Sequence, residues 1–186
     1  MKEMINFKRT ALVLIDLQTG IVAPRNGSKV VECAQELVHL FHAHQGLVVF
    51  VTVDFTDGGE ILHVRSDKPA FGDKPPEGWA TLDPALGAEP HDLRIVKRQW
   101  SAFFGTELDL QLRRRQIDTI VIGGISTNRG VESTARDAFQ LGYHQIFAVD
   151  AMKANSQAEH EATVQYIFPY MGHVCTTQQI IEQARQ

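Results

Sequence analysis

The sequence predicts an α/β protein, a three-layer α/β/α sandwich with a mainly parallel sheet of about six strands. Apolar runs of strand length alternate along the chain with amphipathic stretches of helix length. The apolar runs have no polar face, and strands of this kind need helices on both sides of a parallel sheet. No linker rich in proline, glycine or serine divides the chain, so we expect a single domain over residues 1–186.

The first half of the chain contains three clear elements. Residues 10–15 form a continuous apolar strand, and residues 47–53 form a second one. Between them, residues 29–44 carry apolar side chains at the spacing of one helix face, and Gly46 lies where a glycine commonly ends a helix. This order of elements is that of a parallel βαβ unit.

The second half repeats this alternation. Its predicted elements are a strand at 93–96, a helix at 106–115, a strand at 119–122, a helix whose first turn begins near Gly130, a strand at 145–149, a helix at 157–167 and a terminal helix from Thr176. Between residues 54 and 90 the periodicity is lost, and so long a connection is usually a lid, a binding loop or an oligomer contact. Its aromatic residues Phe55, Phe71 and Trp79 either pin it to the core or line a pocket.

Composition and charge limit the classes of partner. The chain has a formal net charge of −4 and no basic stripe, so neither nucleic acid nor an anionic membrane is expected as a partner. A small-molecule substrate is the better expectation. The first residues lack the apolar segment of a signal peptide, and no run is long enough to span a membrane, which favours a cytoplasmic protein.

Cysteine and histidine spacing predicts no metal and no other cofactor. Cys33 and Cys175 lie far apart within apolar patterns, which favours buried structural thiols over a disulfide or a zinc site. His39, His42 and His44 lie on or near one helix without a partner at a metal spacing, so we interpret them as a solvated helix face. The glycine-rich motifs that bind nucleotide phosphates are missing.

Three polar features follow strands of the predicted sheet. Asp16 comes directly after the first strand, Lys97 after the third, and the turn that ends at Gly130 after the fourth. In an open, Rossmann-like parallel sheet, ligands bind beyond the carboxyl ends of the strands. There, burial raises the pKa of a carboxyl group toward acid/base use, and a nearby ammonium lowers it again. On spacing alone, loop capping by Asp16 remains an alternative to a catalytic role.

The same segments carry a resemblance to a known family. The order of residues 14–18, 96–106 and 124–138 resembles the isochorismatase-like hydrolase superfamily over nearly the whole chain. In the cysteine hydrolases of that superfamily an Asp, a Lys and a Cys form the catalytic triad, and the resemblance places these roles at Asp16, Lys97 and Gly130. It also implies a non-proline cis peptide at about Ile125-Ser126, an oxyanion hole of amide N–H groups in the following turn, and a homo-oligomer, either a dimer or a tetramer.

Two departures from the family pattern shape the expected chemistry. Gly130 has no side chain, so the usual covalent intermediate on a cysteine cannot form. The isochorismatases proper resemble this chain in having glycine there, and in them the Asp protonates an enol ether so that water attacks the resulting cation. Nicotinamidases of the superfamily hold a metal through an Asp-x-His-x-x-x-His motif, whereas residues 53–59 retain Asp54 and contain no histidine.

The resulting hypothesis is a small-molecule hydrolase in which Asp16 is the general acid/base, Lys97 holds its charge and the substrate, and Gly130 and its neighbours provide N–H groups and space. Candidate substrate-binding residues around them are Gln18, Ser126, Thr127, Trp79 and Phe103. The isochorismatases carry an aromatic residue where Ser126 stands, so the resemblance does not name the substrate. The alternative is a non-catalytic ligand-binding or oligomeric protein that has kept the pocket and lost the nucleophile.

Overall fold

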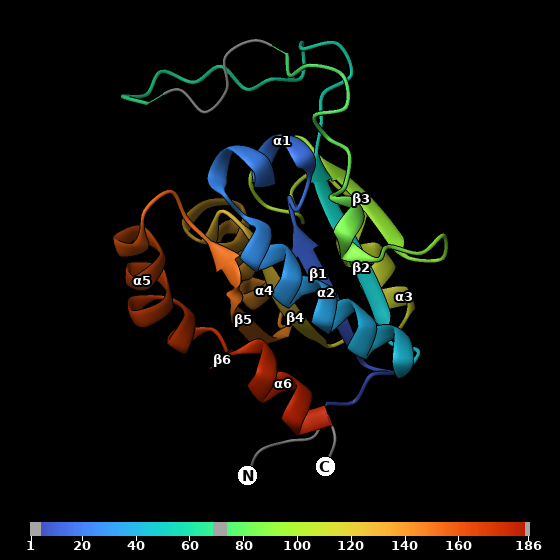
Figure 1. The fold of residues 1–186 in the computed structure, drawn as a ribbon. Coiled ribbons are helices and arrows are strands. Elements are labelled where there is room, and N and C mark those ends of the chain that lie inside the picture. The colour runs from blue at the N-terminus through green and yellow to red at the C-terminus, as the bar shows by residue number, and fades with distance from the viewer. Residues whose placement is uncertain (1–4, 69–73, 185–186) are drawn as a thin grey trace.

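The computed structural model describes residues 5–68 and 74–184, with a six-stranded sheet at the centre. The strands are β1 (Thr10–Ile15), β2 (Leu47–Val53), β3 (Leu93–Lys97), β4 (Thr119–Ile125), β5 (His144–Lys153) and β6 (His173–Cys175). They run in the order β3-β2-β1-β4-β5-β6, and every neighbouring pair is parallel (Figure 1). The predicted α/β fold with a parallel sheet is confirmed. The strand order reverses between β1 and β4, which makes their carboxyl ends a topological switch point.

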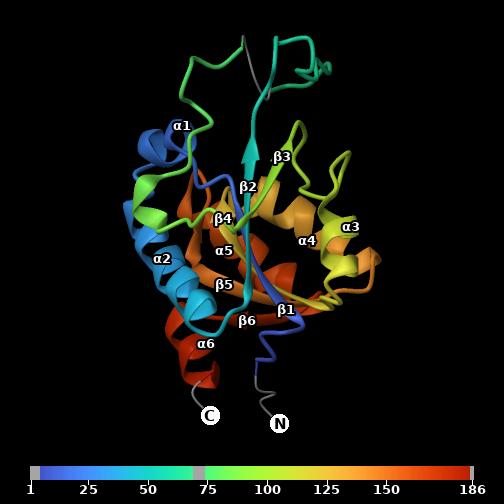
Figure 2. The same cartoon turned by 90° about the vertical axis from the view of Figure 1, so that its right-hand side faces the viewer.

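Helices cover both faces of the sheet (Figure 2). On one face lie α1 (Thr19–Val22), α2 (Ser28–Ala43) and α6 (Thr177–Ala184), and on the other α3 (Leu108–Arg114), α4 (Glu132–Gln140) and α5 (Gln157–Tyr166). Successive side chains of a strand point to opposite faces, so Leu14 of β1 packs in the cluster that contains Leu37 of α2, whereas Val13 packs in the cluster that contains Leu112 of α3. Within the described ranges, no helix combines the length and the apolarity that crossing a bilayer requires.

Several elements differ from their predicted bounds. Helix α4 begins at Glu132 instead of near Gly130, because Thr127–Val131 first form a π-helical turn. Strand β5 extends past its predicted end at residue 149, because a register shift opposite Ile122 and Gly124 lets its second half pair with the end of β4. Strand β6 has three residues and α1 has four, so neither is long enough to produce a periodic pattern in the sequence.

The connection between β2 and β3 is the long irregular segment that the sequence predicts. Among its described residues, the 3₁₀ turn Pro84–Leu86 is the one helical element. Part of it projects from the body of the molecule, as the cyan-to-green chain at the top of Figure 1 shows. Phe55 is buried in the core, Trp79 is partly buried against it, and Phe71 lies outside the described residues.

Candidate active site

Three strands bring polar groups to one edge of the sheet. Strand β1 is followed directly by Asp16, β3 ends at Lys97, and β4 leads into the turn that contains Gly130. Parallel strands share one carboxyl edge, and β1 and β4 are neighbours there. Asp16 has a left-handed backbone with φ 54°, and its amide donates to the carbonyl of Val51 in β2 at 2.8 Å. The sharp turn after β1 thus stays attached to the sheet.

Asp16 and Lys97 form a buried ion pair. The Lys97 Nζ donates to Asp16 Oδ2 at 2.8 Å, and 2% and 7% of the lysine and aspartate side chains are exposed. The same nitrogen donates to the backbone carbonyls of Gln99 at 3.1 Å and Trp100 at 2.9 Å. An ammonium has three N–H donors, so Lys97 has none left to hold the substrate, which differs from the role expected from the sequence. It is a fixed positive charge beside Asp16.

Burial has the largest effect on the pKa of Asp16. It raises the pKa of this carboxyl group above the ordinary value of 3.8, and the positive charges of Lys97 and Arg25 oppose the rise without reversing it. The second oxygen, Oδ1, is buried and accepts no hydrogen bond from any residue that the structure describes. A buried carboxylate oxygen without a donor disfavours the ionised form, which agrees with the raised pKa.

The backbone of Gly130, which carries no side chain, lies beside the ion pair of Asp16 and Lys97. A Cβ atom at position 130 would lie 3.2 Å from Asp16 Oδ2 and 3.4 Å from Lys97 Nζ, so the space over Gly130 opens onto both charged groups. The Gly130 carbonyl accepts a hydrogen bond from the Thr134 hydroxyl at 2.6 Å, and the Thr134 oxygen accepts one from the Ala102 amide at 2.9 Å. The turn before α4 is thereby tied to the segment that follows β3.

A cavity of about 100 Å³ opens at the ion pair. The predicted residues Trp79 and Ser126 line it together with Asp16, Lys97 and Gly130. The peptide bond between Ile125 and Ser126 is cis, as the family resemblance implies. The structure therefore brings five of the eight predicted site residues together at one edge of the sheet.

The other three predicted site residues do not line this cavity. Gln18 is fully buried, and its side-chain amide exchanges two hydrogen bonds, of 3.0 and 2.9 Å, with the last residue of β2. Thr127 is also buried, and its hydroxyl pairs with His160 Nδ1 at 2.8 Å. Phe103 stacks on Tyr143 with ring centroids 5.6 Å apart. All three residues follow the carboxyl end of a predicted strand in the sequence. This position does not determine the direction in which a side chain points.

The lining contains two arginines that the sequence reasoning missed. Arg25 ends the 3₁₀ turn Ala23–Arg25 after α1, and Arg129 precedes Gly130 in the π-helical turn. The available signal was their position near the first and fourth strand ends. Periodicity and spacing do not distinguish such a cation from one on the surface.

One histidine of α2 corrects a sequence-based interpretation. Among the described residues, His42, Glu89 and His91 form the one group whose donor atoms lie near enough to hold a metal ion, within 4.8 Å. The two ring nitrogens of His42 already face carboxylates, with Nε2 2.8 Å from Asp92 and Nδ1 3.3 Å from Glu89. His42 thus belongs to a polar cluster instead of a solvated helix face. The cluster lies where α2 ends and β3 begins, at the amino edge of the sheet, opposite to Asp16.

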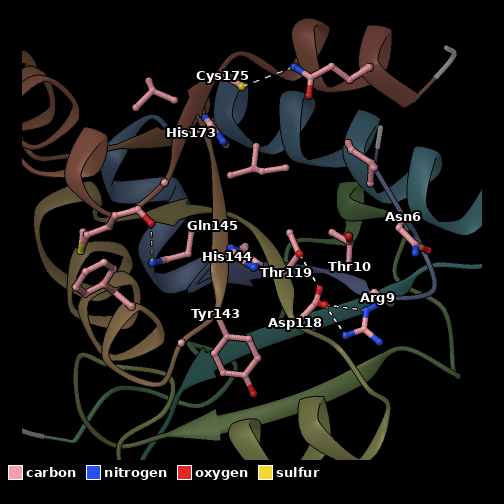
Figure 3. A pocket seen from close by; sticks show the side chains of 18 residues that line it. Asn6, Arg9, Thr10, Asp118, Thr119, Tyr143, His144, Gln145, His173 and Cys175 are labelled. Carbon is pink, nitrogen blue, oxygen red and sulfur yellow. Dashed lines mark hydrogen bonds and ion pairs between the residues drawn. The ribbon is translucent and has the colours of Figure 1, made fainter. Parts of the chain in front are cut away.

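A larger hollow of about 870 Å³ also lies at the amino edge, beside the first residues of β1, β4, β5 and β6 (Figure 3). Its charged residues Arg9 and Asp118 are paired with each other at 2.6 Å, and 50% and 39% of their side chains are exposed. A solvated ion pair provides no desolvated acid or base. The buried pair at the opposite edge is therefore the better candidate for catalysis.

Comparison with known proteins gives four similarities. A family model described as "Isochorismatase domain" matches residues 10–179. The chain is 53% identical over 183 residues to the "Uncharacterized isochorismatase family protein YwoC" of Bacillus subtilis, which covers 97% of each protein. A solved isochorismatase family protein from Burkholderia thailandensis has a TM-score of 0.93 and 39% identity, over 98% of both chains. Over 97 residues, 52% of this chain and 37% of the relative, the chain is 41% identical to the ureidoacrylate amidohydrolase RutB of Methylobacterium radiotolerans.

Proposed function

The chain belongs to the isochorismatase family, whose relatives include hydrolases, and from this premise we propose that it hydrolyses a small molecule by acid/base catalysis without a covalent cysteine intermediate. One observation carries the proposal. The buried carboxyl group of Asp16 is held by Lys97 at 2.8 Å and opens onto the bare backbone of Gly130. A buried acid beside a fixed cation, at the mouth of a cavity, is suited to proton transfer.

Asp16 is the proton donor in this proposal. Its raised pKa leaves a larger fraction protonated at a given pH than an ordinary aspartate has. With an enol ether as substrate, the proton adds to the enol carbon and leaves an oxocarbenium carbon, which water attacks. The water returns a proton to Asp16, and the resulting hemiketal breaks into an alcohol and a carbonyl compound.

Lys97 and Gly130 have supporting roles. When Asp16 loses its proton, the negative charge that appears on the carboxylate lies 2.8 Å from the Lys97 ammonium, which stabilises it. The three acceptors of Lys97 keep this charge in place before and after the proton moves. Gly130 leaves room for the reacting atom beside Asp16, because a side chain there would meet both charged groups.

The proposal is tested by screening the purified protein against enol ethers and small amides. For any compound that is turned over, we expect Asp16→Asn to lower kcat by about 100-fold or more, the loss typical of removing a general acid. Asp54→Asn is the matched control, because Asp54 follows β2 at the same edge but is exposed. Ligand-induced stabilisation without turnover would instead support the alternative, a binding protein that has lost catalysis.

We also propose that the protein forms a homo-oligomer. The connection between β2 and β3, part of which projects from the molecule, exposes 56% of Leu62 and 57% of Val64. Apolar side chains on a projecting segment gain free energy when a second copy of the chain buries them. Size-exclusion chromatography with light scattering is expected to give a dimer or a tetramer, and a monomer at all concentrations would refute the assignment.

A further inference from the structure

Two arginines give the cavity at Asp16 an excess of positive charge. Arg25 and Arg129 line it together with Lys97 and Asp16. Lys97 is matched by Asp16 at 2.8 Å, so the two guanidinium groups are the uncompensated charges of the lining. The whole chain has a net charge of −4, so this concentration of positive charge does not follow from a basic composition.

Neither guanidinium group has a carboxylate partner in the part of the chain that the structure describes. Arg25 donates through Nε to Asn155 Oδ1 at 3.3 Å, and through a terminal nitrogen to the Ile21 carbonyl at 3.4 Å. The side chain of Arg129 makes no hydrogen bond or ion pair with any described residue. A guanidinium carries five N–H donors, so both arginines keep unused donors beside the cavity.

The two positive charges also act on each other. The pKa of Arg25 is lowered, first by burial and second by the charge of Arg129. Holding two like charges beside one small cavity costs free energy, and an anion bound between them offsets that cost. The two guanidinium groups thus favour a negatively charged ligand in this cavity.

We propose that Arg25 and Arg129 bind a carboxylate group of the substrate, so that the protein acts on a small organic anion. The planar fork of a guanidinium group matches the two oxygens of a carboxylate. Ile21, Trp79 and Trp100 line the same cavity and suit the hydrocarbon part of such a ligand. The reaction on this anion rests on the proposed function, whereas the binding does not.

Binding of an anion also acts on Asp16. The charge of Arg25 lowers the pKa of Asp16, against the larger effect of burial. A carboxylate bound to Arg25 neutralises that charge, so the pKa of Asp16 rises further when the substrate is present. Binding of the anionic substrate would thus keep Asp16 protonated, which is the state that a proton donor requires.

The experiment compares two probes of the same shape, crotonate and crotonamide, by isothermal titration calorimetry and thermal shift. We expect crotonate to bind the wild-type protein about tenfold more tightly or better, because hydrogen bonds between charged groups are the stronger ones. Its affinity should fall as the salt concentration rises. Inorganic phosphate is the third probe, and tighter binding of phosphate than of crotonate would overturn the carboxylate assignment.

The arginines are tested one at a time. Arg25→Gln and Arg129→Gln are each expected to reduce the preference for crotonate by about tenfold, whereas Arg9→Gln, at the opposite edge of the sheet, should leave it unchanged. Thermal melting of each variant shows whether it is folded. If one variant is not folded, the variant of the other arginine provides the test. Equal affinity for the two probes, binding of neither, or a preference that survives both substitutions would overturn the proposal.

Asp16→Asn separates this inference from the proposed function. The substitution removes a negative charge from the cavity, so crotonate should bind the variant at least as tightly as it binds the wild-type protein. Anion binding without any turnover supports the arginine site and contradicts the hydrolase. If turnover of a neutral substrate requires Asp16 and the protein does not prefer crotonate to crotonamide, the result supports the hydrolase and contradicts the arginine site.

Discussion

The ammonium of Lys97 lies 2.8 Å from the carboxylate of Asp16, although 81 residues of sequence separate the two. The strand order β3-β2-β1 brings them together across the end of β2. Removing one partner of a buried ion pair leaves an uncompensated charge, which typically costs about 3–5 kcal/mol. The pair therefore contributes to stability as well as to the proposed chemistry, and mutations can measure each role separately.

Lys97→Met is expected to lower the free energy of unfolding by about 3–5 kcal/mol, because Asp16 is left buried without a cation. The double variant with Asp16→Asn should be less destabilised than the sum of the single variants, by about 1–3 kcal/mol. Urea denaturation of the four proteins measures this coupling. Lys29→Met is the control, since its ion pair with Glu32 is exposed and should contribute little. Strictly additive effects would mean that the ion pair is not formed in solution.

The raised pKa of Asp16 predicts how its contribution to stability depends on pH. The native state holds this proton more tightly than the unfolded state, so the contribution is fully present below the ordinary value of 3.8 and is lost as pH rises through the native pKa. Relative to Asp16→Asn, the wild-type protein should therefore lose unfolding free energy over the window that begins at 3.8 and extends upward. Chemical denaturation at a series of pH values gives this difference. A difference that grows with pH instead would show that Lys97 outweighs burial.

The rate of turnover should follow the same titration. A general acid must carry its proton, so kcat/KM is expected to fall as pH rises through the native pKa of Asp16, above 3.8. The pH profile is measured on any substrate that the screen identifies. A profile whose descending limb lies at or below 3.8 would exclude Asp16 as the proton donor.

Gly130→Cys is expected to create a reactive thiol. The new Cβ would lie 3.4 Å from the Lys97 ammonium and 3.2 Å from Asp16 Oδ2. When Asp16 carries its proton, the ammonium charge and the helical turn that leads into α4 lower the pKa of a thiol. Alkylation by iodoacetamide, followed by mass spectrometry of the intact protein, should modify the variant much faster than the wild-type protein, in which burial raises the pKa of the Cys33 thiol.

Gly130→Ala is the matched control for this experiment, because it adds the same Cβ atom without a thiol. We expect it to lower turnover and to leave the rate of alkylation at the wild-type level. Loss of activity on alkylation of the wild-type protein at Cys33 or Cys175 would indicate a displaced nucleophile. A Gly130→Cys thiol that reacts like an ordinary buried one would favour the non-catalytic alternative.

Gln18→Met is expected to destabilise the protein without changing substrate affinity. The side-chain amide of Gln18 satisfies the amide and the carbonyl of Val53, and a buried backbone group left without a partner costs about 1–3 kcal/mol. Urea denaturation and KM measured on the same variant separate the two effects. A raised KM at unchanged stability would restore Gln18 to the substrate-binding residues.

The sequence predicts the sheet well because strands buried on both faces are unusually apolar. All six residues of β1 are buried, whereas β6 has only three residues and carries no such signal. The carboxyl ends of parallel strands make Asp16 and Lys97 candidates, and the family resemblance assigns them their catalytic roles. The direction of the Thr127 side chain depends on His160, a contact 33 residues away that no local pattern records.

A single hydroxyl gives the cavity a mechanical property. The Thr134 oxygen is bonded to the Gly130 carbonyl on one side and to the Ala102 amide on the other, and Trp100, two residues before Ala102, holds the Lys97 ammonium with its carbonyl. The turn at Gly130 and the segment that positions the cation are therefore connected through the Thr134 hydroxyl. One hydroxyl group therefore fixes the distance between the backbone that borders the cavity and the segment that orients its buried cation.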